Sequence, residues 1–374
     1  MKLTCILLTL LAIYVIGAFL FNALIFLLSY YESQTTQFTS GRWKAGWPKP
    51  NGKWFWTTIK EAPFTMFGLF VLPFGLINRD EEMNRRRGNE LPPVLFVHGW
   101  SFNRICWWVT IKKLAHINNR KFYTVNLPTT KMTVEKQTDF LAKRIDEALA
   151  QTGHEKIVVV AHSLGGLVTR FYAAQHGTEK LDTVVTLGSP HYGTKLAYLG
   201  PQFVGGIVMR EMEPGSETLT KLAKVTLSNI RVINIATVHD NFVMPFDTAF
   251  LPGAEHYVLQ GKGHNRMLVD SQVIGIIADT LILPPQEKKA PKPAATKSNS
   301  SNATVPKKIP VATAVVEAKK AEPAKTKAKA AAKSKPAAKS ETTKTKNTKP
   351  QKSDTKKAAS KSKTPKKTGT KTGK

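Results

Sequence analysis

The sequence is poor in cysteine, and this excludes a disulfide-stabilised fold. Only two of the 374 residues are cysteines, Cys5 and Cys106. Cys5 lies inside an apolar N-terminal run, so we expect no disulfide between the two. Such low cysteine use fits a reducing compartment only weakly, because many bacterial envelope proteins also lack disulfides. Nothing near Cys106 resembles a Cys–His nucleophile pair, and we expect its role to be structural.

The sequence lacks a set of metal-ligating residues at the spacing of a known kind of metal site. Nowhere do His, Asp and Glu cluster at the spacing of a metal site. We therefore predict no metal and no other cofactor.

Acidic residues are few, with 26 Asp and Glu against 55 Lys and Arg, and the net charge is +29. This imbalance belongs to one end of the chain. From Gln286 onward there are 26 Lys, no Arg and five acids, a net of +21 that leaves only +8 for residues 1–285. The basic character therefore describes a C-terminal tail, not the rest of the molecule.

The tail, residues 286–374, contains no aromatic residue and few large aliphatic ones. Its Lys-, Ala- and Pro-rich composition cannot bury enough apolar surface to offset the entropy of folding, so we predict disorder. A tail of this kind resembles lysine-rich histone tails, which implies a polyanionic partner: nucleic acid in the cytoplasm, or acidic lipid or an acidic envelope polymer elsewhere. A tail that only confers solubility is the alternative.

A long hydrophobic run opens the chain. No charged residue occurs between Leu3 and Leu28, and Tyr30 and Tyr31 end the run. A transmembrane helix needs about 20 apolar residues, so residues 1–31 are predicted to be a transmembrane anchor. A cleaved signal peptide is the alternative; it would show a shorter apolar stretch and a small-residue cleavage site, and neither is evident.

Residues 32–90 are predicted to form an apolar juxtamembrane segment. Four tryptophans stand among its arginines and lysines: Trp43, Trp47, Trp54 and Trp56. This mixture is typical of the headgroup layer, and covering an edge of the folded core is the alternative. The run Phe64–Ile77 is short and broken by Pro73. It is predicted to be interfacial, re-entrant or packed on the next domain, with a second span less favoured.

Residues 91–285 alternate between strand-like and helix-like segments. Strands are predicted at Pro93–Val97, Phe122–Leu127, Lys156–Val160, Asp182–Leu187, Arg231–Ala236 and His256–Gln260. Helices are predicted at Trp107–His116, Val134–Leu149, Leu164–Ala174 and Ser271–Leu283. Continuous apolar strands that alternate with helices indicate an α/β domain, with a mostly parallel central sheet covered by helices on both faces.

The segment Ala161-His162-Ser163-Leu164-Gly165-Gly166 follows one predicted strand directly and opens the next helix. This is the context of a nucleophile elbow, a sharp turn that raises a serine hydroxyl above the sheet. Small residues two positions before and after the serine let the turn pass close to its neighbours. We therefore predict that Ser163 is a nucleophile; a serine that only caps the helix is the alternative.

This motif resembles the elbow of bacterial lipases and esterases of the α/β-hydrolase superfamily, with Ala161 in place of the first glycine of G-x-S-x-G. The resemblance covers roughly residues 91–283, and includes neither the anchor nor the tail. It implies that Val97-His98-Gly99-Trp100 is the oxyanion element. The backbone N–H groups of Trp100 and Leu164 would then stabilise the oxyanion.

The resemblance also implies an acid and a base that follow the serine in that order. Asp240 comes just after a predicted strand, and His264 lies on a glycine-flanked loop after the next one. Asp240 would orient His264, which would accept the serine proton. Asp247 is the alternative acid. His239 and His256 are poorer candidates for the base, because neither occupies the glycine-flanked loop.

Two further segments are predicted to surround the site. Gly188-Ser189-Pro190-His191 follows the strand after the elbow and is expected to line the acyl pocket, with His191 in a structural role. Residues 195–228 form an apolar insertion that is either a lid or a packed cap.

Together these features predict a membrane-anchored carboxylic ester hydrolase that acts on lipidic or medium-chain esters. An acyltransferase or thioesterase using the same triad is an alternative, and so is a non-enzymatic tether that binds polyanions through its tail. One cation precedes the first span and five follow it within residues 42–60. The positive-inside tendency therefore slightly favours a cytoplasmic catalytic domain, although many proteins of this class are secreted. The oligomeric state is left open.

Overall fold

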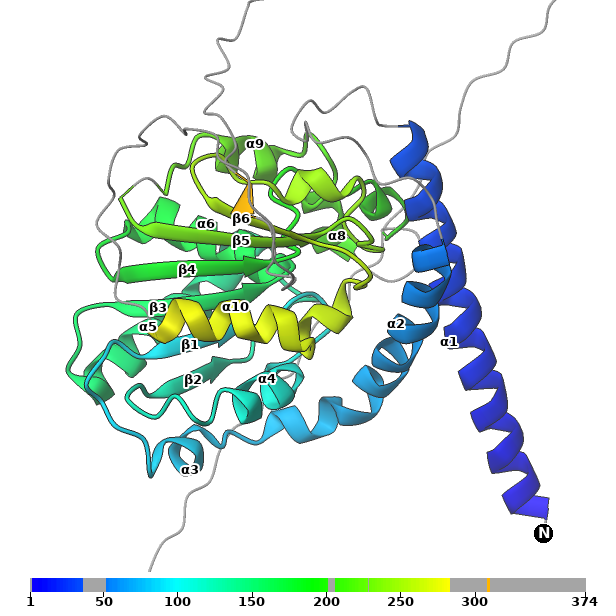
Figure 1. The fold of residues 1–374 in the computed structure, drawn as a ribbon, viewed down its shortest axis with the longest axis horizontal. Coiled ribbons are helices and arrows are strands. Elements are labelled where there is room, and N and C mark those ends of the chain that lie inside the picture. Colours follow the sequence, from blue (N-terminus) through cyan, green and yellow to red (C-terminus); the bar gives the residue numbers. More distant parts are fainter. Residues whose placement is uncertain (1, 36–51, 201–205, 228, 283–307, 310–374) are drawn as a thin grey trace, which may run out of the picture. The chain divides into compact units, whose positions relative to one another are not determined.

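The computed structural model describes residues 2–35, 52–200, 206–227, 229–282 and 308–309, all within the first of two units, Met1–Val315. Its centre is a seven-stranded sheet of order β2-β1-β3-β4-β5-β6-β7 (Figure 1). The six parallel strands are β1 Val94–Val97, β2 Phe122–Val125, β3 Ile157–His162, β4 Leu181–Leu187, β5 Arg231–Thr237 and β6 Glu255–Leu259.

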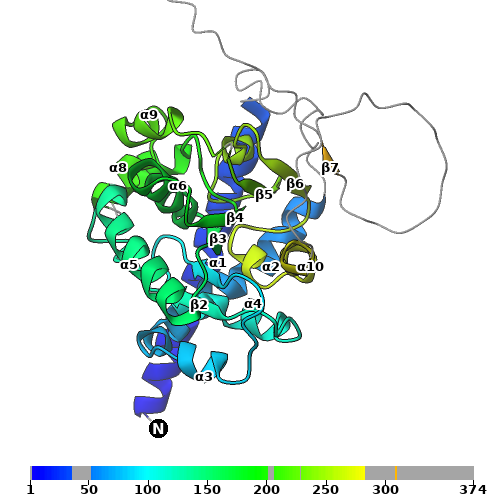
Figure 2. The same cartoon turned by 90° about the vertical axis from the view of Figure 1, so that its left-hand side faces the viewer.

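Strands β1, β2 and β3 are buried because helices cover both faces of the sheet. Every residue of β1, β2 and β3 is buried, as expected for a parallel sheet with no solvated face. On one face pack α5 Val134–Thr152 and α6 Leu164–His176; on the other pack α4 Trp108–Lys113 and α10 Ser271–Ile282 (Figure 2). The prediction of an α/β domain with a mostly parallel, doubly covered sheet is confirmed.

The predicted elements differ from the observed ones mainly at their ends. The helix expected over Trp107–His116 begins with the 3-10 turn η2 Arg104–Trp107 and ends at Lys113. Helix α5 extends three residues beyond the prediction. Its first turn is capped by Thr133, and it stops at Gly153, which adopts the left-handed conformation with φ 72°.

The N-terminal run forms one long helix, α1 Lys2–Thr35. Its segment Thr4–Glu32, with a mean hydropathy of 2.5, is long and apolar enough to cross a membrane. The first half of α1 is largely exposed, whereas the second half buries Asn22, Ile25, Phe26 and Ser29. These four positions recur at helical spacing and form one face. The apolar helix therefore also packs against the protein.

A second helix, α2 Gly52–Val71, packs beside α1 and leads through η1 Leu72–Leu76 to α3 Asp80–Asn84 (Figure 1). Trp54 is buried and contacts Tyr30 and His239, so it covers the core, whereas Trp56 is exposed. Trp43 and Trp47 lie outside the described residues. The run Phe64–Ile77 is helical through most of its length, and α2 also contacts η5 Asn265–Leu268.

The insertion contains η3 Lys195–Leu199, α8 Gly206–Glu211 and α9 Glu217–Ala223. The remaining 3-10 turn, η4, spans Phe246–Ala249. Most of the tail predicted to be disordered lies outside the described residues. Lys308–Ile309 are the exception: they form β7, which pairs antiparallel with β6, so the prediction of a tail without secondary structure does not hold for this pair.

Candidate active site

Ser163 lies in the tight connection between β3 and α6. Its backbone angles are φ 55° and ψ −124°, a conformation that a residue with a side chain adopts only when its surroundings enforce it. The backbone N–H of Ser163 donates to Leu187 O at 2.8 Å, which ties the turn to the end of β4. This is the geometry expected of a nucleophile elbow.

Two glycines allow neighbouring chains to approach this turn. A Cβ atom on Gly165 would lie 2.7 Å from the carbonyl oxygen of His98, and one on Gly99 would lie 2.8 Å from Ser163 Cβ. Both distances are too short for a real Cβ. The loop that carries Trp100 therefore lies directly against the serine, as its expected role in the oxyanion hole requires.

His98 holds this loop from within. Its Nδ1 lies 2.8 Å from Gly99 O, and its Nε2 accepts the N–H of Leu127 at 2.9 Å. Burial lowers the pKa of His98 to about 4, so the ring is neutral at pH 7. Since Nε2 accepts, Nδ1 carries the proton and donates to Gly99 O. His98 therefore orients the loop and has no free nitrogen for catalysis.

The structure brings Asp240 and His264 together. His264 Nδ1 lies 3.0 Å from both carboxylate oxygens of Asp240, and both side chains are buried. Asp240 Oδ1 also accepts the N–H groups of Phe242 and Val243, at 2.9 and 2.8 Å. Backbone donors and the imidazole thus surround the carboxylate and fix its position.

Glycine also leaves room for this pair. Gly188 follows β4 with φ 52°, and a Cβ there would lie 3.0 Å from Asp240 Oδ2 and 3.1 Å from His264 Nδ1. The backbone N–H of His264 donates to Asn241 Oδ1 at 3.0 Å, which links the histidine loop to the loop of the acid. Asp247, the alternative acid, is buried in η4, and Asp240 is the carboxylate that reaches His264.

The other histidines have local partners. His239 packs on Trp54, and its Nδ1 accepts from Gly261 N. His256 contacts Asn234, and His191 lies near Thr186 in the interior. Burial lowers the pKa of all three. They are therefore neutral structural groups.

Three residues near the site were not singled out from the sequence. His162, buried beside His264 with ring centroids 4.6 Å apart, approaches His264 O with its Nε2 at 3.2 Å. Ser29 of α1 donates to the main-chain oxygen of Asp240 at 2.6 Å. Glu61 of α2 accepts the N–H groups of Asn265 and Arg266. His162 could have been found from the sequence, because it stands next to the serine. Ser29 and Glu61 could not, because they lie 211 and 204 positions from Asp240 and Asn265, their partners.

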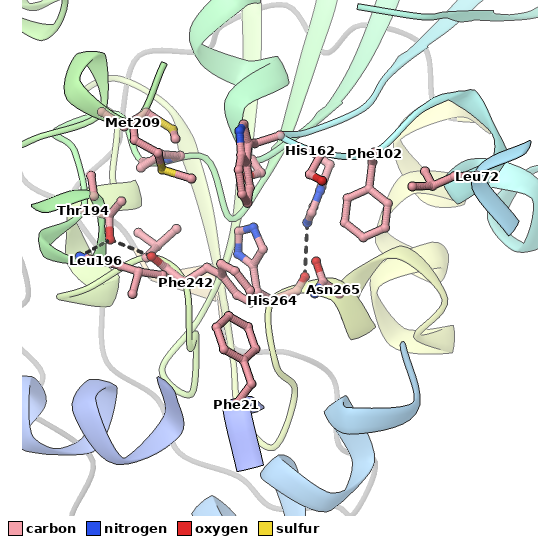
Figure 3. Close-up of a pocket in the computed structure, with 17 residues that line it drawn as sticks. Phe21, Leu72, Phe102, His162, Thr194, Leu196, Met209, Phe242, His264 and Asn265 are labelled. Carbon is pink, nitrogen blue, oxygen red and sulfur yellow. Dashed lines mark hydrogen bonds between the residues drawn. The ribbon is translucent and has the colours of Figure 1, made fainter. Parts of the chain in front are cut away.

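A cavity of about 180 Å³ opens at Ser163 and His264. Its walls come from separate parts of the chain, among them Phe21 of α1, Leu72 of η1, Phe102, Phe242 and Met209 of the insertion (Figure 3). Figure 3 shows the side chain of Phe21 reaching from α1 toward this cavity. Pro190 lines the cavity, as predicted for its segment. An apolar pocket with few polar groups suits the acyl chain of an ester.

Within the described residues, no group of three or more His, Cys, Asp or Glu side chains could hold a metal ion. The groups that meet at the cavity are a serine, an imidazole and the carboxylate bonded to that imidazole. Cys106 is unpaired, and burial raises the pKa of its thiol, which makes it a poor nucleophile.

The chain matches the family model described as the alpha/beta hydrolase fold over residues 92–206. A triacylglycerol lipase of Pseudarthrobacter phenanthrenivorans is 30% identical over 112 residues, which are 28% of this chain and 35% of the relative. A pimeloyl-[acyl-carrier protein] methyl ester esterase of Vibrio campbellii is also 30% identical over 112 residues, 30% of this chain and 42% of that protein. The match therefore spans less than half the length of either relative.

Among solved structures, the mature form of a Bacillus licheniformis lipase is 17% identical, with a TM-score of 0.44, and the match covers 53% of this chain and 94% of that one. The family model and the parallel sheet show that the chain has the α/β-hydrolase fold. Its similarity to lipases and esterases is distant.

Proposed function

We propose that this protein is a membrane-anchored serine hydrolase that cleaves lipidic or medium-chain carboxylic esters through an acyl-enzyme. One observation carries the proposal: Ser163 in a strained elbow and His264 line the same apolar cavity, while Asp240 bonds to the far nitrogen of that histidine. A serine, an imidazole and an orienting carboxylate are together sufficient for acyl transfer.

The first half of the reaction forms an ester on the enzyme. His264 Nε2 removes the proton from Ser163 Oγ, which attacks the substrate carbonyl carbon. Asp240 holds the Nδ1 proton of His264 and stabilises the imidazolium that forms. The N–H groups of Trp100 and Leu164 donate to the oxyanion, a contribution of about 3 kcal/mol for each such donor. The imidazolium then protonates the departing alcohol.

The second half releases the acid. His264, neutral again, removes a proton from water, and the resulting hydroxide attacks the acyl carbon. The tetrahedral intermediate collapses, Ser163 Oγ leaves, and the imidazolium returns its proton to it. An amine, thiol or alcohol in place of water would make the same site an acyltransferase.

Two observations support an apolar acyl group. The cavity is lined mainly by aliphatic and aromatic side chains. The relatives named above are a triacylglycerol lipase and a methyl ester esterase, both of which act on carboxylic esters according to their names.

The packing of α1 supports an uncleaved anchor over a signal peptide. Ile25 and Phe26 are buried against the protein, and Ser29 donates to Asp240 O. Cleavage after the helix would remove these contacts, together with Phe21 from the cavity wall. A segment that completes the site is expected to remain in the mature protein.

The test is hydrolysis of p-nitrophenyl esters of increasing chain length by full-length protein in detergent, beside Ser163→Ala. We expect medium-chain esters to be preferred and kcat to fall by about 10⁴-fold or more in the variant. A fluorophosphonate probe should label the wild type at Ser163. A folded wild type that neither hydrolyses an ester nor takes the label would exclude the proposal and favour the tether.

A further inference from the structure

The loop that carries His264 is held by a carboxylate from a distant helix. Glu61 lies in α2 and is fully buried. Its Oε1 accepts the N–H of Asn265 at 2.6 Å, and its Oε2 accepts the N–H of Arg266 at 3.0 Å. These two residues immediately follow His264. A carboxylate that bridges two successive amides restrains both the position and the direction of the chain there.

The fit around this carboxylate is close. A Cβ on Gly263 would lie 2.4 Å from Glu61 Oε2, so the residue before His264 leaves space for it. On the same side of α2, Trp54 and Thr57 are buried as well, and their spacing places them on one helix face with Glu61. α2 thus docks on the histidine loop through a packed face that contains one carboxylate.

The neighbouring helix, α1, contacts Asp240, the residue that bonds to His264. Ser29 of α1 donates to the main-chain oxygen of Asp240 at 2.6 Å. α1 and α2 also pack on each other, with Tyr30 edge-on to Trp54 at 5.7 Å. The N-terminal helices therefore contact the backbone of Asp240 and of the two residues that follow His264.

We propose that Glu61 is a positioning residue that fixes the His264 loop so that its imidazole faces Ser163, an inference that rests on the proposed function. Glu61 acts through the amides of Asn265 and Arg266. Losing a restraint one residue from the base would let the imidazole move, and a displacement of about 1 Å in such a group can lower the rate by about 100-fold.

The charge of Glu61 provides a specific readout. Burial raises the pKa of Glu61 to about 7. The two amide hydrogen bonds and His264 act to lower this pKa, and the nearby Asp240 acts to raise it. Below that pH the carboxyl gains a proton and loses acceptor capacity. Full activity of the wild type should thus require Glu61 to be deprotonated.

The experiment compares full-length wild type, Glu61→Gln and Asp80→Asn in detergent. Asp80 is the matched control: it is also buried and also accepts a backbone N–H, that of Thr124 in β2, but it lies in α3 and pairs with Arg144. The measurements are kcat and KM for a p-nitrophenyl ester from pH 5 to 9, the rate of fluorophosphonate labelling, and Tm.

We expect kcat to fall by about 10- to 100-fold in Glu61→Gln with little change in KM. The acid limb of log kcat/KM should be steeper in wild type than in Glu61→Gln, because only the wild type takes up a proton at position 61 as the pH falls through about 7. Asp80→Asn should lower Tm and keep the wild-type pH profile. If Glu61→Gln does not fold, Glu61→Asp replaces it. The shorter side chain leaves its carboxylate about 1.5 Å short of the amides of Asn265 and Arg266. We therefore expect kcat to fall while the steep acid limb remains.

The outcomes distinguish a failure of the Glu61 positioning role from a failure of the proposed hydrolase function. An active wild type with an unchanged pH profile and kcat in the Glu61 variant would overturn the positioning role alone. A wild type that is inert towards both the ester and the fluorophosphonate would overturn the proposed function and this inference with it.

Discussion

At the residue scale, the site depends on how closely neighbouring backbones approach the serine. Gly165 packs against the carbonyl oxygens of Val97 and His98, at the end of β1. His98 in turn holds Gly99, and the next residue, Trp100, is the proposed oxyanion donor. A single methyl group at position 165 would therefore press on the loop that shapes the oxyanion hole.

We predict that Gly165→Ala lowers the free energy of unfolding by about 1–3 kcal/mol, because the Cβ meets backbone atoms that cannot move aside cheaply. The value of kcat should fall at least about tenfold as the oxyanion donors shift. Urea unfolding and ester hydrolysis measure the two effects. Gly275→Ala is the control: its Cβ would meet nothing within 4 Å in α10, so it should stabilise by about 0.5–1 kcal/mol. Wild-type behaviour of Gly165→Ala would contradict this account.

At the element scale, the two halves of α1 differ in how much of their side-chain surface is buried. Its first half is exposed and apolar, as a membrane span requires, while its second half buries one face against the protein. Lys195 forms an ion pair with Glu32 near the C-terminal end of α1, which adds a polar contact to the apolar ones. Phe21 lies where the exposed half gives way to the buried half, and it lines the cavity. Under the proposed function, one helix would combine membrane attachment with contact to the substrate.

Phe21→Ala should therefore change acyl-chain selectivity. We expect kcat/KM for an octanoyl ester to fall about tenfold, while that for an acetyl ester, too short to reach the wall, stays unchanged. The ratio of the two values is the measurement. Phe19→Ala removes the same ring from an exposed position on α1 and should leave the ratio alone. Equal effects of the two substitutions would exclude Phe21 from the pocket.

At the scale of the whole molecule, charge and catalysis occupy different parts of the chain. The tail from Gln286 holds a net charge of +21 of the total +29, whereas Ser163, Asp240 and His264 lie in the sheet domain. Lysine side chains bind polyanions mainly by releasing condensed counterions, which makes the affinity depend strongly on salt. Binding through the tail and ester hydrolysis should therefore be separable.

We predict that the full-length protein binds duplex DNA at 50 mM salt and loses most of that affinity by 200 mM, a fall of about 10³-fold or more if six or more phosphates are neutralised. Fluorescence anisotropy of a labelled duplex measures this. A chain ending at residue 285 should lose the binding and keep its esterase activity. Absence of binding by the full-length protein even at low salt would leave the tail a solubilising segment.

The sequence alone determined those features that depend on residues adjacent in the chain: the strands, the helices and the turn at Ser163. Continuous apolar runs predicted the buried strands, and the helical spacing of apolar residues predicted helices such as α5 within a few residues. The elbow around Ser163 was recognisable because its strand, turn and helix are contiguous. Asp240 and His264 could be selected because the resemblance to lipases and esterases implies an acid and a base in that order after the serine, each on the loop that follows a strand.

Only the tertiary structure decided which distant groups complete the site. Nothing in the sequence around Glu61, Ser29 or Phe21 indicates a partner, since each lies in a helix whose local pattern is satisfied by packing or by membrane insertion. Their contacts with Asn265, Asp240 and the cavity arise when α1 and α2 dock on the loops that follow β5 and β6. Local patterns arise from short-range backbone and side-chain preferences, whereas docking depends on the shape and polarity of surfaces that exist only after the sheet has formed.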